Sequence, residues 1–219
     1  MEQNAFKIEK EVDVLAGRLL LAGHLSIPHL VKGIVAFAHG SGSSRHSPRN
    51  KAVARELNKA QLATLLFDLL TKEEETNRNN VFDIPLLAER LLEVTMWLRQ
   101  QEGISELPVG YFGASTGSAA ALWAAADPQS KVMAVVSRGG RVDMALPKLV
   151  DVHAPTLLIV GGLDEVVIDL NQQSQTHLRC ENQLVIVPGA THLFEEPGAL
   201  EQVADLARSW FLKYLNKWQ

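Results

Sequence analysis

The chain has little cysteine, few aromatic side chains and no long apolar run. Cys180 is the single cysteine among 219 residues, so no intramolecular disulfide can form, which fits a reducing compartment. No stretch approaches the roughly 20 consecutive apolar residues that a membrane-spanning helix needs. The segment Met1–Lys10 lacks a basic region followed by an apolar one, so the sequence predicts no signal peptide. These features together predict a cytoplasmic protein.

A strong excess of charge is also absent. The sequence has 21 Lys and Arg against 25 Asp and Glu, a formal net charge of −4. Proteins that bind nucleic acid or an anionic membrane surface carry a marked basic excess, so we expect neither as a partner. What the chain does have is apolar residues, at 47%, enough to build a sizeable core. No linker interrupts the pattern of elements, so residues 1–219 are predicted to form one domain.

Short apolar runs alternate with amphipathic stretches along the chain. Two loosely alternating segments, Lys7–Ala16 and Arg18–Ile27, predict an antiparallel hairpin at a sheet edge. Buried strands are predicted at Gly33–Ala38, Ala63–Leu70, the first part of Val109–Gly117, Lys131–Val136, Thr156–Val160 and Gln183–Val187. Helices are predicted from Pro48 to about Gln61 and at Phe82–Gln101, Ser118–Ala126, Val142–Val150, Val166–Leu178 and Pro197–Lys217. This alternation predicts an α/β fold, with a mostly parallel open sheet, the antiparallel hairpin at its N-terminus and helices on both faces.

The stretch Val109–Gly117 carries the most specific motif. It reads as an apolar strand that turns through Gly113-Ala114-Ser115-Thr116-Gly117 into an alanine-rich helix. A G-x-S-x-G sequence between a strand and a helix is typical of a sharp turn that holds the serine hydroxyl out at the top of a sheet. The alternative is a turn rich in glycine and serine without chemistry. We favour Ser115 as a nucleophile because a base and an acid follow it in the right places.

A serine hydroxyl needs a base, and the base needs a carboxylate to fix its tautomer. His192 follows the last predicted strand in a glycine-containing turn, and Asp164 follows a strand and two glycines. Both lie at the carboxyl ends of strands, where ligands collect in sheets of this kind. A lone histidine is more often a solvated or core residue, Asp164 could instead cap the next helix, and Asp169 is an alternative acid. The order Ser115, Asp164, His192 favours a catalytic triad.

A tetrahedral intermediate also needs donors for its oxyanion. One donor is the backbone N–H of Thr116, which follows the nucleophile. The other should come from the loop after Gly33–Ala38, and His39-Gly40-Ser41-Gly42 is such a loop. We predict the N–H of Ser41 as the second donor; a flexible glycine turn is the alternative.

Specificity is harder to predict. Arg45, Arg49, Arg138 and Arg141 all fall in or near loops on the same face of the sheet, where an arginine can grip a substrate carboxylate. Arg138 is the best candidate because it directly follows a predicted strand, and Arg45 and His39 are further candidate substrate contacts. Alternatively, the arginines pair with the carboxylates of residues 73–75 in a neighbouring loop. The sequence has no metal-ligand spacing and no phosphate loop, so we expect no metal and no cofactor.

Taken together, these motifs resemble the α/β-hydrolase superfamily. The loops His39–Asn50 and Leu65–Glu75 and the absence of a cap insertion are most similar to the dienelactone hydrolase-like branch, whose characterised members use a cysteine where this chain has Ser115. The resemblance implies a serine hydrolase that cleaves a small carboxylic ester, thioester or lactone through an acyl-serine intermediate. Two alternatives remain: an acyltransferase with the same triad, and a ligand-binding protein that keeps the fold without turnover. A small molecule is the expected partner, and a homo-oligomer is possible.

Overall fold

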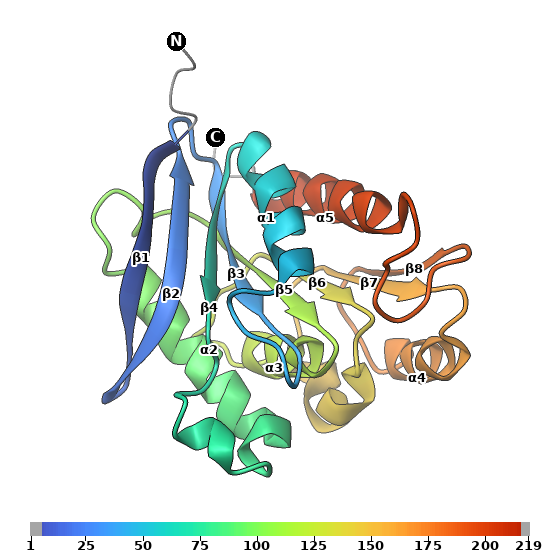
Figure 1. The fold of residues 1–219 in the computed structure, drawn as a ribbon. Coiled ribbons are helices and arrows are strands. Elements are labelled where there is room, and N and C mark those ends of the chain that lie inside the picture. The colour runs from blue at the N-terminus through green and yellow to red at the C-terminus, as the bar shows by residue number, and fades with distance from the viewer. Residues whose placement is uncertain (1–5, 216–219) are drawn as a thin grey trace.

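The computed structural model of the chain describes residues 6–215, and its centre is one eight-stranded sheet (Figure 1). The strands are β1 (Phe6–Ala16), β2 (Leu19–Pro28), β3 (Gly33–Ala38), β4 (Leu62–Phe67), β5 (Val109–Ala114), β6 (Ala134–Arg138), β7 (Thr156–Gly161) and β8 (Asn182–Val187). Their spatial order is β1-β2-β4-β3-β5-β6-β7-β8. The predicted hairpin is confirmed: β1 pairs antiparallel with β2, β2 pairs antiparallel with β4, and all other pairs are parallel.

Helices cover both faces of this sheet, as predicted (Figure 1). The α-helices are α1 (Pro48–Lys59), α2 (Ile84–Leu98), α3 (Thr116–Ala125), α4 (Glu165–Gln175) and α5 (Ala199–Leu215). Shorter 3-10 segments are Glu74–Thr76, Asn80–Phe82 and Val142–Asp151. Helices α1 and α5 lie on one face, and α2, α3 and α4 lie on the other. Within the described range, no helix is long and apolar enough to cross a lipid bilayer.

Two apolar cores result, one on each face. The first packs α2 and α3 against side chains such as Leu65 and Tyr111, and the second packs α1 and α5 against side chains such as Phe37 and Phe112. Because β3, β4 and β5 contribute to both cores, all their residues are buried. Central strands covered on both faces read as continuous apolar runs, which is why these strands could be recognised in the sequence.

Several element ends differ from the prediction. The fourth strand stops at Phe67 rather than Leu70, because the chain then turns and the Leu69 N–H donates to His39 Nε2. The sixth strand begins at Ala134, since Lys131 has a φ of 44°, and it ends with Arg138 inside it. The predicted helix at Val142–Val150 is a 3-10 helix because Pro147 has no N–H to donate. The predicted helix end at Lys217 lies outside the described residues.

The parallel strands all end at the same edge of the sheet. There β5 leads into Ser115, β6 ends at Arg138, β7 leads to Asp164 and β8 leads to the turn that carries His192. The loop after β3 joins them, since β3 lies beside β5. The predicted site residues are therefore gathered at one edge by the topology alone.

One buried polar contact ties α2 to the strand that precedes Ser115. The Tyr111 hydroxyl lies 2.6 Å from Thr95 Oγ1, which in turn donates to the Leu91 carbonyl at 2.8 Å. Since Thr95 has one proton to give, Tyr111 is the donor to Thr95. Both side chains are fully buried, and burial raises the pKa of Tyr111.

This contact predicts an asymmetric pair of substitutions. Tyr111→Phe removes only the donor and should lower the free energy of unfolding by about 1 kcal/mol. Thr95→Val leaves the buried Tyr111 hydroxyl without a partner and should lower the free energy of unfolding by about 1–3 kcal/mol. The double variant should be more stable than the sum of the two losses implies. Urea unfolding of the three variants measures this. Strictly additive losses would show that the two hydroxyls do not interact.

Candidate active site

The turn at Ser115 has an unusual backbone conformation. Ser115 has φ 52° and ψ −120°, a region that residues with side chains rarely adopt. Three backbone bonds hold it there: its N–H donates to the Arg138 carbonyl at 3.1 Å, and its own carbonyl accepts from Ser118 N–H at 3.0 Å and Arg141 N–H at 3.1 Å. The surrounding hydrogen bonds thus impose a strained geometry that presents the hydroxyl at the strand–helix junction.

Two glycines allow this turn to form. A Cβ on Gly113 would overlap the backbone of Ser118, and a Cβ on Gly117 would overlap the carbonyl of Ala38. Both obstacles are backbone, so neither can move aside cheaply. The glycines of the motif are therefore required by close approach of chain segments, as their spacing in the sequence predicts.

His192 and Asp164 form a short hydrogen bond. The distance from His192 Nδ1 to Asp164 Oδ2 is 2.6 Å, and the side chains are 38% and 16% exposed. Two hydrogen bonds fix Thr191, the residue before His192. Thr191 donates its N–H and its hydroxyl to the carboxylate of Glu196 at 3.1 and 2.6 Å. A carboxylate on Nδ1 leaves Nε2 of the ring for a proton transfer.

Ser115 and His192 line one pocket of about 230 Å³. Arg138 lines it as well and is 7% exposed. Within the described chain, Arg138 Nε and Nη1 are buried without a hydrogen-bond partner. Burial and the nearby charge of Arg49 lower the pKa of Arg138 to about 10, so the guanidinium remains charged at neutral pH. A buried cation without a partner, beside a hydroxyl and an imidazole, has the charge to pair with an anionic group.

The other three arginines named in the sequence analysis are paired, but with different carboxylates from those expected. Arg49 bonds to Glu195 at 2.8 Å, Arg141 bonds to Asp143 at 2.8 Å, and Arg45 pairs with Asp68. None of the three pairs with residues 73–75. Arg138 therefore differs from the other arginines on this face in having no carboxylate partner.

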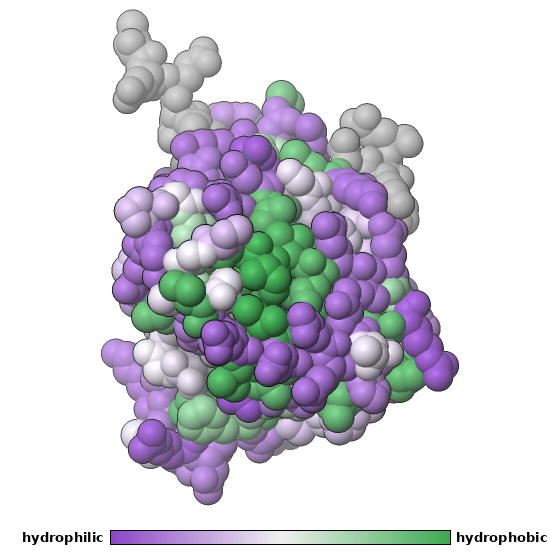
Figure 2. Space-filling view, turned by 90° about the vertical axis from the view of Figure 1, so that its right-hand side faces the viewer, coloured by the Kyte–Doolittle hydropathy of each residue, from purple (hydrophilic) through white to green (hydrophobic). Residues whose placement is uncertain are grey.

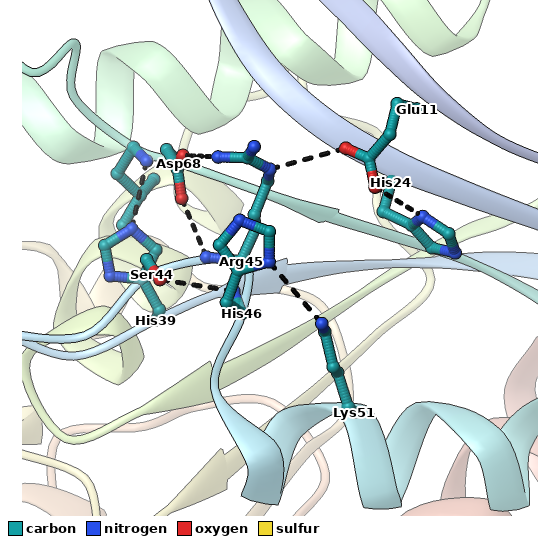
Figure 3. A network of polar contacts seen from close by, with 9 residues as sticks. Glu11, His24, His39, Ser44, Arg45, His46, Lys51 and Asp68 are labelled. Atoms are coloured by element: carbon teal, nitrogen blue, oxygen red, sulfur yellow. Dashed lines mark hydrogen bonds and ion pairs between the residues drawn. The ribbon is translucent and has the colours of Figure 1, made fainter.

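Arg45 and His39 both take part in polar contacts with other segments of the chain (Figure 3). The Arg45 guanidinium lies between Asp68 and, at 3.5 Å, Glu11, which in turn bonds His24 at 2.9 Å. Arg45 does not line the pocket of Ser115. This charge network links the loop after β3 to β1, β2 and the end of β4, so in this structure the Arg45 guanidinium serves a structural contact and its predicted substrate contact stays a prediction.

His39 is tied to the backbone through both ring nitrogens. Nε2 accepts from the Leu69 N–H at 3.1 Å, so the proton sits on Nδ1 and is donated to the Gly40 carbonyl at 3.0 Å. Burial lowers the pKa of His39, which favours this neutral form. Although His39 lines a neighbouring cavity, neither ring nitrogen is left for a substrate. It positions the peptide between Gly40 and Ser41 instead.

The two predicted oxyanion donors lie side by side. The Ser41 N–H donates to Thr116 Oγ1 at 2.8 Å, and the Thr116 N–H begins α3, where the first N–H groups have no partner within the helix. Both residues line a second cavity of about 650 Å³. This cavity shares Gly40, Ser41 and Arg49 with the pocket of Ser115. The larger cavity thus opens beside the smaller one.

Asn50 was not singled out in the sequence. It lies in the first turn of α1, is 2% exposed, and lines the pocket of Ser115 with Oδ1 buried and without a partner in the described structure. Its N–H donates to Ser47 Oγ, which caps the helix. Its position three residues after the capping Ser47 is the one sequence signal that could have pointed to it.

Metal ligands do not gather anywhere in residues 6–215. No group of three or more His, Cys, Asp or Glu side chains is placed to hold an ion there. Cys180 lies at the far end of the sheet from Ser115, just before β8, with burial raising the pKa of its thiol.

No family model matches the chain, but it is strongly similar to known proteins. The crystal structure of dienelactone hydrolase from Anabaena variabilis is 56% identical, with a TM-score of 0.92, covering 95% of this chain and 98% of that one. A Mycobacterium tuberculosis protein named as a candidate phosphoribosyl transferase is 63% identical over 207 residues. The match takes in 94% of this chain and 47% of that protein, so the chain spans about half of this curated relative.

A more distant structure shows the same fold. Est1E from Butyrivibrio proteoclasticus is 16% identical, with a TM-score of 0.77 over 93% of this chain and 98% of that one. At this identity the likeness concerns the fold alone.

The backbone strain at Ser115 predicts a stability change that is separate from chemistry. Ser115→Ala keeps the strained φ, whereas Ser115→Gly relieves it, at a cost in chain entropy of about 0.5–1 kcal/mol. We therefore expect Ser115→Gly to unfold with a free energy about 0.5–2 kcal/mol above that of Ser115→Ala. Chemical denaturation of both variants provides the measurement. A less stable glycine variant would mean that the turn is not strained.

Proposed function

The chain belongs to the dienelactone hydrolase-like α/β-hydrolases, and on that premise we propose that it hydrolyses a small carboxylic ester, thioester or lactone through an acyl-serine intermediate. A hydrolase-type function is the assignment that the family itself supports. The finer proposal depends on one observation. A His192–Asp164 hydrogen bond of 2.6 Å lies at a pocket that also contains the strained Ser115.

In the proposed reaction, His192 Nε2 takes the proton of Ser115 as Oγ attacks the substrate carbonyl. Asp164 accepts from Nδ1–H and stabilises the positive charge that forms on the ring. Collapse of the tetrahedral intermediate breaks the bond to the leaving group, which receives that proton from His192. Water then attacks the acyl-serine in the same way and releases the acid.

The oxyanion would be stabilised by the backbone N–H groups of Thr116 and Ser41. The Ser41 N–H already donates to Thr116 Oγ1. In this proposal the N–H either donates to Thr116 Oγ1 and the oxyanion together or leaves Thr116 Oγ1 for the oxyanion. His39 holds the Gly40–Ser41 peptide in place through its bond to the Gly40 carbonyl.

Acyl transfer to an acceptor other than water would use the same residues. A ligand-binding protein would not need a serine, a histidine and a carboxylate together, which is why we favour an enzyme. The phosphoribosyl transferase name belongs to a protein about twice as long as the matched region, and the pocket described here contains groups for acyl chemistry. We therefore do not extend that name to this chain.

The substrate is proposed to carry an anionic group. Arg138 is buried, charged and unpaired at the pocket of Ser115, and a carboxylate of the substrate would satisfy it. The pocket that Ser115 lines is about 230 Å³, which favours a small acyl group at the serine, while the adjoining cavity of about 650 Å³ leaves room for the rest of the substrate.

The proposal predicts that Ser115→Ala abolishes ester hydrolysis in a folded protein. Loss of a nucleophile costs several orders of magnitude in kcat. A screen of p-nitrophenyl esters, acyl-CoA thioesters and lactones, together with labelling by a fluorophosphonate probe, measures the effect. Cys180→Ser is the control and should keep its activity, because that thiol lies far from the pocket. Turnover by Ser115→Ala, or no labelling of the wild type, would contradict the proposed mechanism.

The anionic-substrate proposal predicts a selective effect of Arg138→Gln. One charge-assisted contact is worth about 1.5–3 kcal/mol, or roughly one to two decades in kcat/KM for an ester that bears a carboxylate. A neutral ester of the same shape should be nearly unaffected. Arg141→Gln is the matched control, since that arginine is paired with Asp143. An equal loss for both esters in Arg138→Gln would make Arg138 structural.

A further inference from the structure

The two free edges of the sheet differ in how they are protected. Strand β1 forms one edge, and charged side chains recur along it: Lys7, Glu9, Lys10, Glu11 and Asp13. Strand β8 forms the other edge, reads Asn-Gln-Leu-Val-Ile-Val, and has no charge, no proline and no bulge. Proteins normally block an exposed edge with charges or proline, because its free backbone groups invite another strand. An unblocked edge is therefore expected to be covered in the working protein.

The backbone groups that β8 leaves free can be identified from its pairing with β7. The Thr156 N–H donates to the Glu181 carbonyl and the Gly162 N–H donates to the Val187 carbonyl. Strand residues alternate in direction, so the odd-numbered residues of β8 face β7. The N–H and C=O groups of Asn182, Leu184 and Ile186 consequently point away from the sheet.

We propose that β8 pairs antiparallel with β8 of a second copy of this chain, about a two-fold axis at Leu184. In this register Leu184 faces its own counterpart and Asn182 faces Ile186 of the other copy. Every outward N–H and C=O of these residues then meets its complement, which is the pattern of an antiparallel hydrogen-bonded pair. The strand is thus self-complementary, as a two-fold interface requires.

Charged side chains on the same side of the molecule support a second copy of this chain as the partner of β8. Helix α4 runs opposite to β8: it begins near the end of β8, and Gln175 in its last turn bonds Asn182 at 2.8 Å. Glu165 lies at its start and Arg179 in the connection to β8; both are exposed and have no ion pair in the described structure. The two-fold axis brings the start of one α4 to the end of the other. Glu165 of each copy would then face Arg179 of the other copy.

The surface around β8 is apolar as well as self-complementary. Figure 2 faces this edge and shows a continuous hydrophobic area at its centre. Ile186 is 36% exposed, and Leu184 and Val185 are only partly buried. A stable dimer buries about 1,200–2,000 Å², more than two strands supply alone. Helices α4 and α5 contact β8 from the two faces and would extend the interface on both sides.

Sedimentation equilibrium of the full chain over a range of concentrations tests the proposal without reference to any activity. We expect a dimer in the micromolar range. Ile186→Lys should raise the dissociation constant at least about a hundredfold, because each copy would place a charged ammonium in the apolar surface around the strand pair. Leu20→Lys, an exposed site in the hairpin at the opposite edge, is the control and should leave the dimer intact. A monomeric wild type, or an Ile186→Lys variant that still dimerises, would overturn the proposal.

A charge exchange tests the two-fold register without touching the core. Glu165→Arg and Arg179→Glu should each raise the dissociation constant about tenfold or more, since symmetry counts each change twice. The double variant restores opposite charges and should dimerise close to the wild-type level. If the double variant is no tighter than either single one, the proposed register is wrong.

Discussion

The close approach of three backbone segments behind Ser115 is the constraint on which the rest of this structure depends. The end of β3, the end of β5 and the first turn of α3 meet there with no room for a side chain on Gly113 or Gly117. This contact imposes the positive φ of Ser115, and it also fixes the loop after β3 against the helix. The Ser41 N–H reaches Thr116 only because those segments touch. Strain at one residue is thus maintained by packing that the whole sheet supports.

Charge at the same edge is distributed unevenly. Most arginines here are neutralised by nearby carboxylates, and the network around Arg45 fastens the loop after β3 to the hairpin of the sheet. Arg138 is left desolvated and without a carboxylate. An unpaired buried cation costs stability, and its position at a pocket shared with Ser115 and His192 is the observation behind the proposed anionic substrate.

Much of this arrangement could be predicted from the sequence, because local patterns specify it. Continuous apolar runs identified the central strands, and glycine spacing around Ser115 identified the turn. The pairing of Arg45 could not be predicted, because Asp68 follows β4 and Glu11 lies in β1, and these strands become neighbours of this loop only through the strand order. The same holds for His39, whose partner at Leu69 lies beyond a strand that ends three residues earlier than expected. Contacts between distant segments require the topology, which periodicity does not encode.

The backbone conformation at Ser115 constrains the side chain only as far as its Cβ atom. Its backbone is fixed by bonds to the Arg138, Ser118 and Arg141 peptides, and none of these depends on the atom attached beyond Cβ. Replacing the Ser115 hydroxyl by a thiol should therefore change the free energy of folding little. If Ser115 acts as proposed, such a fold can exchange the reacting atom in a single substitution while the proposed base, acid and oxyanion donors stay in place.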